Sequence, residues 1–400
     1  MNVTFQSTLL FLMTLLFMLM GSGCTSTAQK DSRLSPAHLL LNDAAFSRFD
    51  AYSIEQPTNV FALGDEAKAF VAETTRGLYS EDDKIQALIH RIFARADLDL
   101  IYEASANTVA NDSFRNASAN CLSLSIMTFA MAKEAGFESE FQIVDIPEYW
   151  TRKGGYSLLN SHINLRIKSK SRTNVIKLFD NAFVVDFDPS TRAVDFATEY
   201  ADKQTVLSMF YNNKGVDALL KQNNDLAYAY LREAILADES YSGTWANLGL
   251  LYRKRGLFDL ALRSYERAIS LNGKNSTAWE NLAVLYEQLG DEKAASDIYI
   301  RLNAKRIENP FYHQMLAEIE REKGSFESSI VHYQKAIKLN NKQHQFYFGL
   351  ASVYFDKGDF KRSERFLKLA KRKAGKSKVA DIYVDKLTAL SNFMASANTE

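Results

Sequence analysis

The sequence is poor in cysteine, and its charges balance. Two cysteines, Cys24 and Cys121, occur in 400 residues, so the chain cannot form the several disulfides that staple small secreted domains. The sequence also lacks paired cysteines and a His-Glu-x-x-His string, the spacings that hold zinc, and it implies no metal and no cofactor. Lys plus Arg number 48 and Asp plus Glu number 48, so no net field attracts a phosphate backbone, and we expect no nucleic-acid partner.

One apolar run lies close to the N-terminus. It extends from Leu9 to Met20, interrupted by Thr14, and is shorter than the roughly 20 residues that span a bilayer. Its length matches the apolar core of an export signal, and the small residues Gly21-Ser22-Gly23 after it match a cleavage site. We therefore expect residues 1–23 to be a signal peptide that is removed.

The string Gly21-Ser22-Gly23-Cys24 resembles a bacterial lipobox. The resemblance implies that Cys24 is diacylated, becomes the mature N-terminus and begins a tether that runs to residue 40. Thr25 is not the aspartate that the family's sorting rules associate with inner-membrane retention, so we expect an exported lipoprotein that faces the periplasm from the outer membrane. Gly21 stands where a lipobox usually has an aliphatic residue, and Met1 to Ser7 contain no Lys or Arg, which leaves plain secretion as the alternative.

The second half of the chain repeats with a period of 34 residues, and this period points to a solenoid. Leucines recur in one register, and glycines recur where the first helix of each hairpin must end, a place that favours positive φ. The leucines are Leu248, Leu282, Leu316 and Leu350, and the glycines are Gly256, Gly290, Gly324 and Gly358.

This register resembles the tetratricopeptide (TPR) repeat, as in Trp245-Ala-Asn-Leu248-Gly249-Leu-Leu-Tyr252 followed by Ala261, Tyr265 and Ala268. The resemblance implies an all-α solenoid of about five repeats over residues 206–375, starting near residues 208, 242, 276, 310 and 344. A cap helix and tail would follow in residues 376–400, because the last hairpin of a solenoid otherwise exposes apolar surface.

A TPR array implies a groove that holds a protein or peptide partner, an inference made at the level of the fold. The candidate contacts are polar side chains of the first helices, namely Asn247, Asn281, Arg253 and Lys254. The alternative is that these four side chains are ordinary solvated surface.

The region before the repeats contains Cys121. Asn120 is a good N-cap, and the apolar spacing from Cys121 to Ala135, ended by Gly136, predicts a helix. Cys121 would therefore lie in the first helical turn. Unpaired amides and the helix dipole favour an anion there, and so favour the nucleophilic thiolate over the thiol.

After this helix the apolar pattern alternates, which predicts strands. One strand contains Phe141 and Ile143, and a second places His162 on the face opposite its apolar residues. A third, Ala182 to Asp188, places Asp186 and Asp188 together on one face. The chain order is therefore Cys, His and Asp.

The order of these elements resembles the transglutaminase-like superfamily, which shares the papain-like plan, over roughly residues 60–195. The resemblance implies an α+β domain of helices and antiparallel sheet over residues 41–205. In it Cys121 is the nucleophile, His162 the general base and Asp186 the carboxylate that orients the ring, with Asp188 as the fallback. The resemblance rests on Asn120-Cys121-Leu-Ser-Leu-Ser, Phe141-Gln142-Ile-Val, Ser161-His162-Ile-Asn164-Leu and Val185-Asp186-Phe-Asp188-Pro189.

Together these patterns lead to one main hypothesis and one alternative. The main hypothesis is a membrane-tethered periplasmic thiol enzyme, a cysteine peptidase, amidase or transglutaminase, that acts on a peptide or amide bond of a protein recruited by the repeats. The alternative is a non-catalytic TPR scaffold or assembly lipoprotein in which the transglutaminase-like domain is inactive. Taken singly, Cys121 also fits an inert core thiol and His162 an ordinary strand residue.

Overall fold

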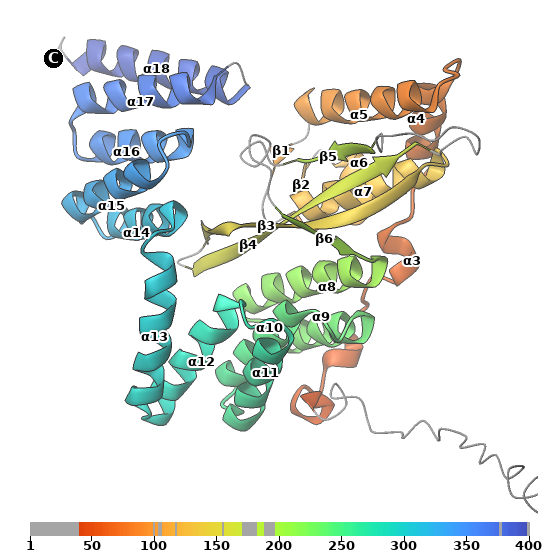
Figure 1. The fold of residues 1–400 in the computed structure, drawn as a ribbon, viewed down its shortest axis with the longest axis horizontal. Helices are drawn as coiled ribbons and strands as arrows, with labels where there is room; N and C mark the ends of the chain where they lie inside the picture. Colours follow the sequence, from red (N-terminus) through yellow and green to blue (C-terminus); the bar gives the residue numbers. More distant parts are fainter. Residues whose placement is uncertain are drawn as a thin grey trace, which may run out of the picture. The chain divides into compact units, whose positions relative to one another are not determined.

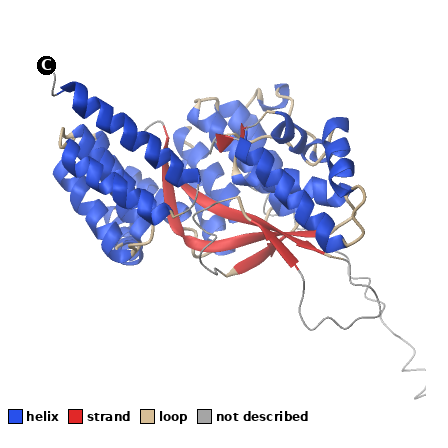
Figure 2. Cartoon of the chain, turned by 90° about the horizontal axis from the view of Figure 1, so that it is seen from above, coloured by secondary structure: helices blue, strands red, loops and turns tan. Residues whose placement is uncertain are grey.

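The computed structural model describes residues 40–98, 101–102, 106–116, 118–153, 156–169, 182–187, 197–375 and 378–397. These residues are mostly helical, with one small antiparallel sheet (Figures 1 and 2). Up to the end of the sheet the elements are η1 (Asp43–Ala45), η2 (Phe49–Ala51), α3 (Pro57–Val60), α4 (Asp65–Thr75), α5 (Glu81–Leu98), β1 (Ile101–Tyr102), α6 (Ala110–Arg115), β2 (Ser118–Ala119), α7 (Cys121–Glu134), β3 (Glu138–Lys153), β4 (Tyr156–Lys168), β5 (Ala182–Val185) and β6 (Thr198–Ala201).

The sheet has the strand order β5-β4-β3-β6, and all neighbouring strands are antiparallel. Leu165 on β4 pairs with Phe141 on β3 and with Val185 on β5, and all three side chains are buried. The register of β3 and β4 shifts just after Val144, which pairs with His162. His162 therefore lies beside an irregularity, a feature that re-aims side chains at many functional sites.

Helix α7 is almost entirely buried and packs on β3 and β4. Asn120 caps it, since its side-chain oxygen accepts a hydrogen bond from the Ser123 amide at 2.8 Å. Gly136 follows the helix with φ +81°, the left-handed conformation that glycine adopts without strain. The sequence predicted both ends of this helix, and the cap fixes where Cys121 lies.

Asn120→Ala is expected to destabilise the protein by about 1 kcal/mol, because it removes the cap from a buried helix end. Thermal unfolding followed by circular dichroism measures this loss. Asn275→Ala is the comparison variant. Asn275 caps the repeat helix that begins at Ser276 in the same way, so this variant shows the cost of losing a cap that lies far from Cys121 along the chain. Equal stability of Asn120→Ala and wild type would show that the cap contributes nothing.

The remaining described chain forms helical hairpins that follow one another in the repeat region (Figure 1). The helices are α8 (Lys203–Leu220), α9 (Asn224–Ala237), α10 (Ser242–Lys254), α11 (Phe258–Leu271), α12 (Ser276–Leu289), α13 (Glu292–Arg306), α14 (Pro310–Glu322), α15 (Phe326–Leu339), α16 (His344–Asp356), α17 (Phe360–Ala374) and α18 (Lys378–Ala397).

The hairpins have the geometry that the 34-residue period predicts. Helices α10, α12, α14 and α16 each begin 34 residues after the one before. The four glycines that follow these helices have φ between +73° and +81°. Gly249 shows why small residues recur inside the hairpins, since a Cβ there would lie 2.5 Å from the Tyr265 ring. The prediction of an all-α TPR-like solenoid is therefore confirmed.

The first hairpin differs from the others because α8 shares a core with the sheet region. Val206 and Phe210 of α8 are fully buried in the same apolar cluster as residues of α7 and β4. The Asn107 side chain donates a hydrogen bond to the Phe210 carbonyl at 2.7 Å. The predicted domain boundary at residue 205 therefore lies inside one continuous core.

The segment from Asp43 to Glu55 also packs on the repeats, although the sequence analysis groups it with the α+β domain. The Phe46 ring stacks on Tyr228 of α9, with ring centroids 4.2 Å apart. Asp43 accepts hydrogen bonds from the Tyr228 hydroxyl at 2.7 Å and from Arg232 at 3.1 Å. These contacts hold the segment against α9.

An ionic contact around the buried Arg306 joins β3 to the third and fourth repeats. Arg306, at the end of α13, pairs with Glu280 of α12 at 2.8 Å and with Glu148 of β3 at 3.5 Å. Asn309, just before α14, donates to the Glu148 carbonyl at 2.7 Å. Burial lowers the pKa of Arg306, but the two carboxylates outweigh this effect and raise it, so the guanidinium stays charged.

The predicted signal peptide, Cys24 and residues 25–39 of the tether lie outside the described residues. Among the helices that the structure does describe, none combines the length and the apolarity that a bilayer crossing requires.

Candidate functional site

Cys121 lies at the first position of α7, where the chain enters the core. The residue is 7% exposed. The amide of the preceding Asn120 donates to the Ala106 carbonyl at 3.0 Å, and the Ser123 hydroxyl accepts from the Thr108 amide at 2.9 Å. These bonds join the start of α7 to residues 106–108 and hold Cys121 in one place.

His162 and Asp186 are direct partners. The Nε2 atom of His162 lies 2.8 Å from an Asp186 carboxylate oxygen, and the His162 side chain is fully buried while that of Asp186 is 14% exposed. Asp186 comes just after β5, which pairs with β4, so the sheet register places the carboxylate near the ring. The sequence alone left Asp186 and Asp188 as alternatives, and Asp188 lies outside the described residues.

The thiol of Cys121 is the second hydrogen-bonding neighbour of the His162 ring. Burial alone lowers the pKa of His162. The hydrogen bonds and charges of Asp186 and Cys121 outweigh burial and raise this pKa to about 9. The ring is therefore an imidazolium at neutral pH, held between a carboxylate and a sulfur.

The structure thus brings together Cys121, His162 and Asp186, which lie far apart in the sequence. Such a cluster can do nucleophilic chemistry, because an imidazolium stabilises a thiolate and can later release its proton. Ala106 and Thr108, which the sequence did not single out, position the start of α7 through the bonds described above, and Asn107 between them bonds α8.

The four candidate partner contacts have different surroundings. Asn247 is half-buried and donates to Asn212 of α8 at 2.8 Å, so it joins the first helices of two repeats. Burial raises the pKa of the Tyr265 phenol to about 12, although the nearby charge of Arg253 lowers it. Asn281 is half-buried and Lys254 is exposed. Asn247 therefore has a structural use within the repeats, and Arg253 lies close to the buried Tyr265.

The described part of the chain contains no group of three or more His, Cys, Asp or Glu side chains placed to hold a metal ion. Two histidines of the fourth repeat, His313 and His332, face each other with their Nδ1 atoms 3.3 Å apart. Burial lowers the pKa of His332, and the neighbouring His313 lowers it further.

Comparison with protein families identifies the repeats. A family model described as TPR repeat matches residues 317–358, and two models described as tetratricopeptide repeat match residues 243–275 and 264–295. These matches fall on the hairpins from α10 to α16. The chain therefore contains tetratricopeptide repeats, as its 34-residue period predicts, and such repeats are protein-interaction scaffolds.

Comparison with solved structures finds similar repeat proteins. A MamA protein is 22% identical, with 42% of this chain and 91% of that chain covered and a TM-score of 0.23. PilF of Pseudomonas aeruginosa is 15% identical, with 50% and 90% covered and a TM-score of 0.27. YrrB, described as a TPR protein with an unusual peptide-binding site, is 14% identical, with 45% and 92% covered and a TM-score of 0.24. No curated protein matches the sequence.

Proposed function

We propose that this protein is a scaffold whose TPR repeats bind a protein or peptide partner. The observation that carries this proposal is the run of regular hairpins from α8 to α17, three segments of which match the family models. A solenoid of this kind presents the first helices of successive repeats side by side, which offers an extended surface to a partner.

Site-specific photocrosslinking tests the scaffold role. A photoreactive amino acid at Asn281 or Ser352, on the first helices α12 and α16, should give discrete crosslinked adducts in cells that express the full chain. The same amino acid at Glu266, an exposed position on the second helix α11, is the control. Adducts at the two first-helix positions and none at Glu266 support the scaffold, while identical patterns at all three positions contradict it.

A second candidate function is thiol-dependent acyl transfer at Cys121, because the cluster of Cys121, His162 and Asp186 supports it. The likeness of this region to the transglutaminase-like superfamily rests on its residues and their order. The sulfur would attack an amide carbonyl, and the protonated His162 would give its proton to the departing amine, leaving a thioester. Water or a second amine would then displace the sulfur and return the proton to His162.

The acceptor decides between hydrolysis and transfer, and both fit the same three residues. With water the protein is a peptidase or amidase, and with an amine it is a transglutaminase. In either case Asp186 would hold the ring in one orientation and stabilise its charge. The repeats would then present the substrate protein. If Cys121 is instead inert, the protein is a scaffold alone.

We further propose that the chain is exported and anchored to the outer membrane, facing the periplasm, by lipid on Cys24. Growth with an alkyne-bearing fatty acid should label the wild-type protein, and Cys24→Ser should abolish the label, because the acyl chains need this sulfur. Cys121→Ser is the matched control and should keep the label. Label that persists in Cys24→Ser would rule out this anchor.

A further inference from the structure

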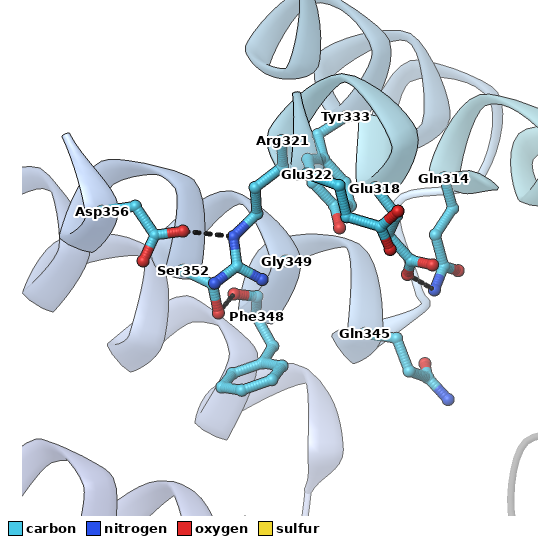
Figure 3. A pocket seen from close by; sticks show the side chains of 10 residues that line it. All are labelled: Gln314, Glu318, Arg321, Glu322, Tyr333, Gln345, Phe348, Gly349, Ser352 and Asp356. Carbon is cyan, nitrogen blue, oxygen red and sulfur yellow. Dashed lines mark hydrogen bonds and ion pairs between the residues drawn. The ribbon is translucent and has the colours of Figure 1, made fainter. Parts of the chain in front are cut away.

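Two pockets of the described chain differ in how their charged side chains are used. In a groove of about 540 Å³ between α14 and α16, Arg321 pairs with Asp356 and the Gln314 amide donates to Glu318 at 2.9 Å (Figure 3). A smaller pocket, of about 290 Å³, has three lysines and one glutamate among its apolar side chains. Its lining residues are Phe61, Leu63, Lys68, Phe129, Ala130, Lys133, Glu134 and Lys203.

The smaller pocket lies at the opposite end of α7 from Cys121. Residues 129–134 are the last turns of α7, while Lys68 belongs to α4 and Lys203 begins α8. Lys133 comes 12 positions after Cys121, which corresponds to about 18 Å along a helix. The pocket is therefore separate from the cluster of Cys121, His162 and Asp186, and its use depends on neither function proposed above.

Two phenylalanine rings hold two of the lysines at the pocket. The Lys203 Nζ lies 4.3 Å from the centre of the Phe61 ring, and the Lys133 Nζ lies 5.5 Å from the centre of the Phe129 ring. An aromatic face attracts an ammonium group at such distances. The rings are themselves fixed, because Phe61 meets Phe129 edge-on at 5.8 Å and Phe129 stacks on the buried Phe141 at 4.6 Å. The core thus orders the cations before any ligand arrives.

Positive charge is in excess in this pocket. Three ammonium groups and the one carboxylate of Glu134 line it, which leaves a surplus of two positive charges. None of the three lysines forms an ion pair with another described residue. The carboxylates next to them in the sequence, Asp65, Glu66 and Asp202, do not line the pocket. Glu66 pairs with Arg115, and Asp202 caps α8. The pocket therefore favours an anion.

The charge and the size of the pocket indicate which anion. A phosphate monoester carries about 1.5 to 2 negative charges at pH 7, which matches the surplus. Lysine binds phosphate as a point charge, whereas the flat carboxylate is the usual partner of the arginine fork, and no arginine is among the lining residues. A volume of about 290 Å³ is at the lower limit of small-molecule pockets. It suits one phosphate with a small organic body rather than an extended peptide.

We propose that this pocket binds a phosphate monoester. Lys68, Lys133 and Lys203 hold the phosphate oxygens by charge-assisted hydrogen bonds, and the organic body packs against Leu63 and the edges of the rings. The same group occurs in a free glycerol or sugar phosphate and in the headgroup of phosphatidic acid, and the lysines recognise it in the same way in both. Glu134 repels the phosphate, so it weakens this binding.

Isothermal titration calorimetry with glycerol 3-phosphate and the full chain, at low ionic strength, tests the proposal. The variant Lys68→Gln/Lys133→Gln/Lys203→Gln should bind about tenfold or more weakly than wild type, the loss expected for charge-assisted bonds. Glu134→Gln should bind more tightly than wild type, because it removes the one negative charge. Added salt should weaken wild-type binding. Flotation with phosphatidylcholine vesicles that contain phosphatidic acid tests the lipid source, with pure phosphatidylcholine as the blank.

The matched control is Lys221→Gln/Lys293→Gln/Lys342→Gln, which removes the same charge at three exposed positions outside the pocket. It should bind as wild type does. Binding of the free ester supports the site in its general form, and binding of the vesicles alone supports it with a lipid headgroup as the ligand. Absence of binding to both probes, or an equal loss in the two triple variants, overturns the proposal. Tighter binding of a polyglutamate peptide than of either probe, lost in the pocket variant, also overturns it.

Discussion

Cys121 in the folded protein is expected to react with iodoacetamide about tenfold faster at pH 6.5 than a free peptide thiol does. A thiol with the reference pKa of about 8.5 is only about 1% ionised at that pH. The positive charge of the His162 ring beside the sulfur should speed the reaction, while the burial of Cys121 reduces the gain. Mass spectrometry of the peptide that contains Cys121 measures the rate.

His162→Ala should remove the advantage, because no cation then faces the sulfur. His90→Ala is the control, since His90 is an exposed residue of α5 and should leave the rate unchanged. A wild-type rate at or below that of the free thiol, with no effect of His162→Ala, would show that Cys121 is an inert core thiol. The scaffold role would then stand alone.

Local patterns in the sequence were sufficient to predict the helices and strands whose positions depend on short-range interactions. The side chain of Asn120 caps α7 and Gly136 follows it, as their residue types predict. The 34-residue period placed the hairpin helices, because each repeat packs on its neighbours by the same small residues. Alternation in residues 141–143 likewise predicted part of β3.

Contacts between distant parts of the chain were not predictable in this way. Nothing in the sequence near Phe46 indicates that it stacks on Tyr228, since that contact depends on where α9 lies. The same holds for Arg306 and Glu148, whose pairing depends on how far β3 extends. The candidate site is an intermediate case, because the order of Cys121, His162 and Asp186 was readable but their proximity was not.

The stability of the folded protein is expected to fall as pH rises from about 6.5 to about 9, and His162 is the cause. Asp186 and Cys121 raise the pKa of its ring to about 9 in the folded chain, against 6.5 when it is unfolded. The folded protein therefore binds more protons than the unfolded chain in this window. The stabilisation is complete below pH 6.5 and is lost as pH passes 9, a change of up to about 3 kcal/mol.

Urea unfolding at several pH values, in wild type and in Asp186→Asn, isolates this effect. An amide at position 186 cannot stabilise the imidazolium by its charge, so the fall between pH 6.5 and 9 should be much smaller in the variant. Asp145→Asn, at an exposed position of β3, should keep the full fall, and Asp188→Asn tests the other carboxylate that the sequence allowed. A slope that survives in Asp186→Asn and disappears in Asp188→Asn would transfer the orienting role to Asp188.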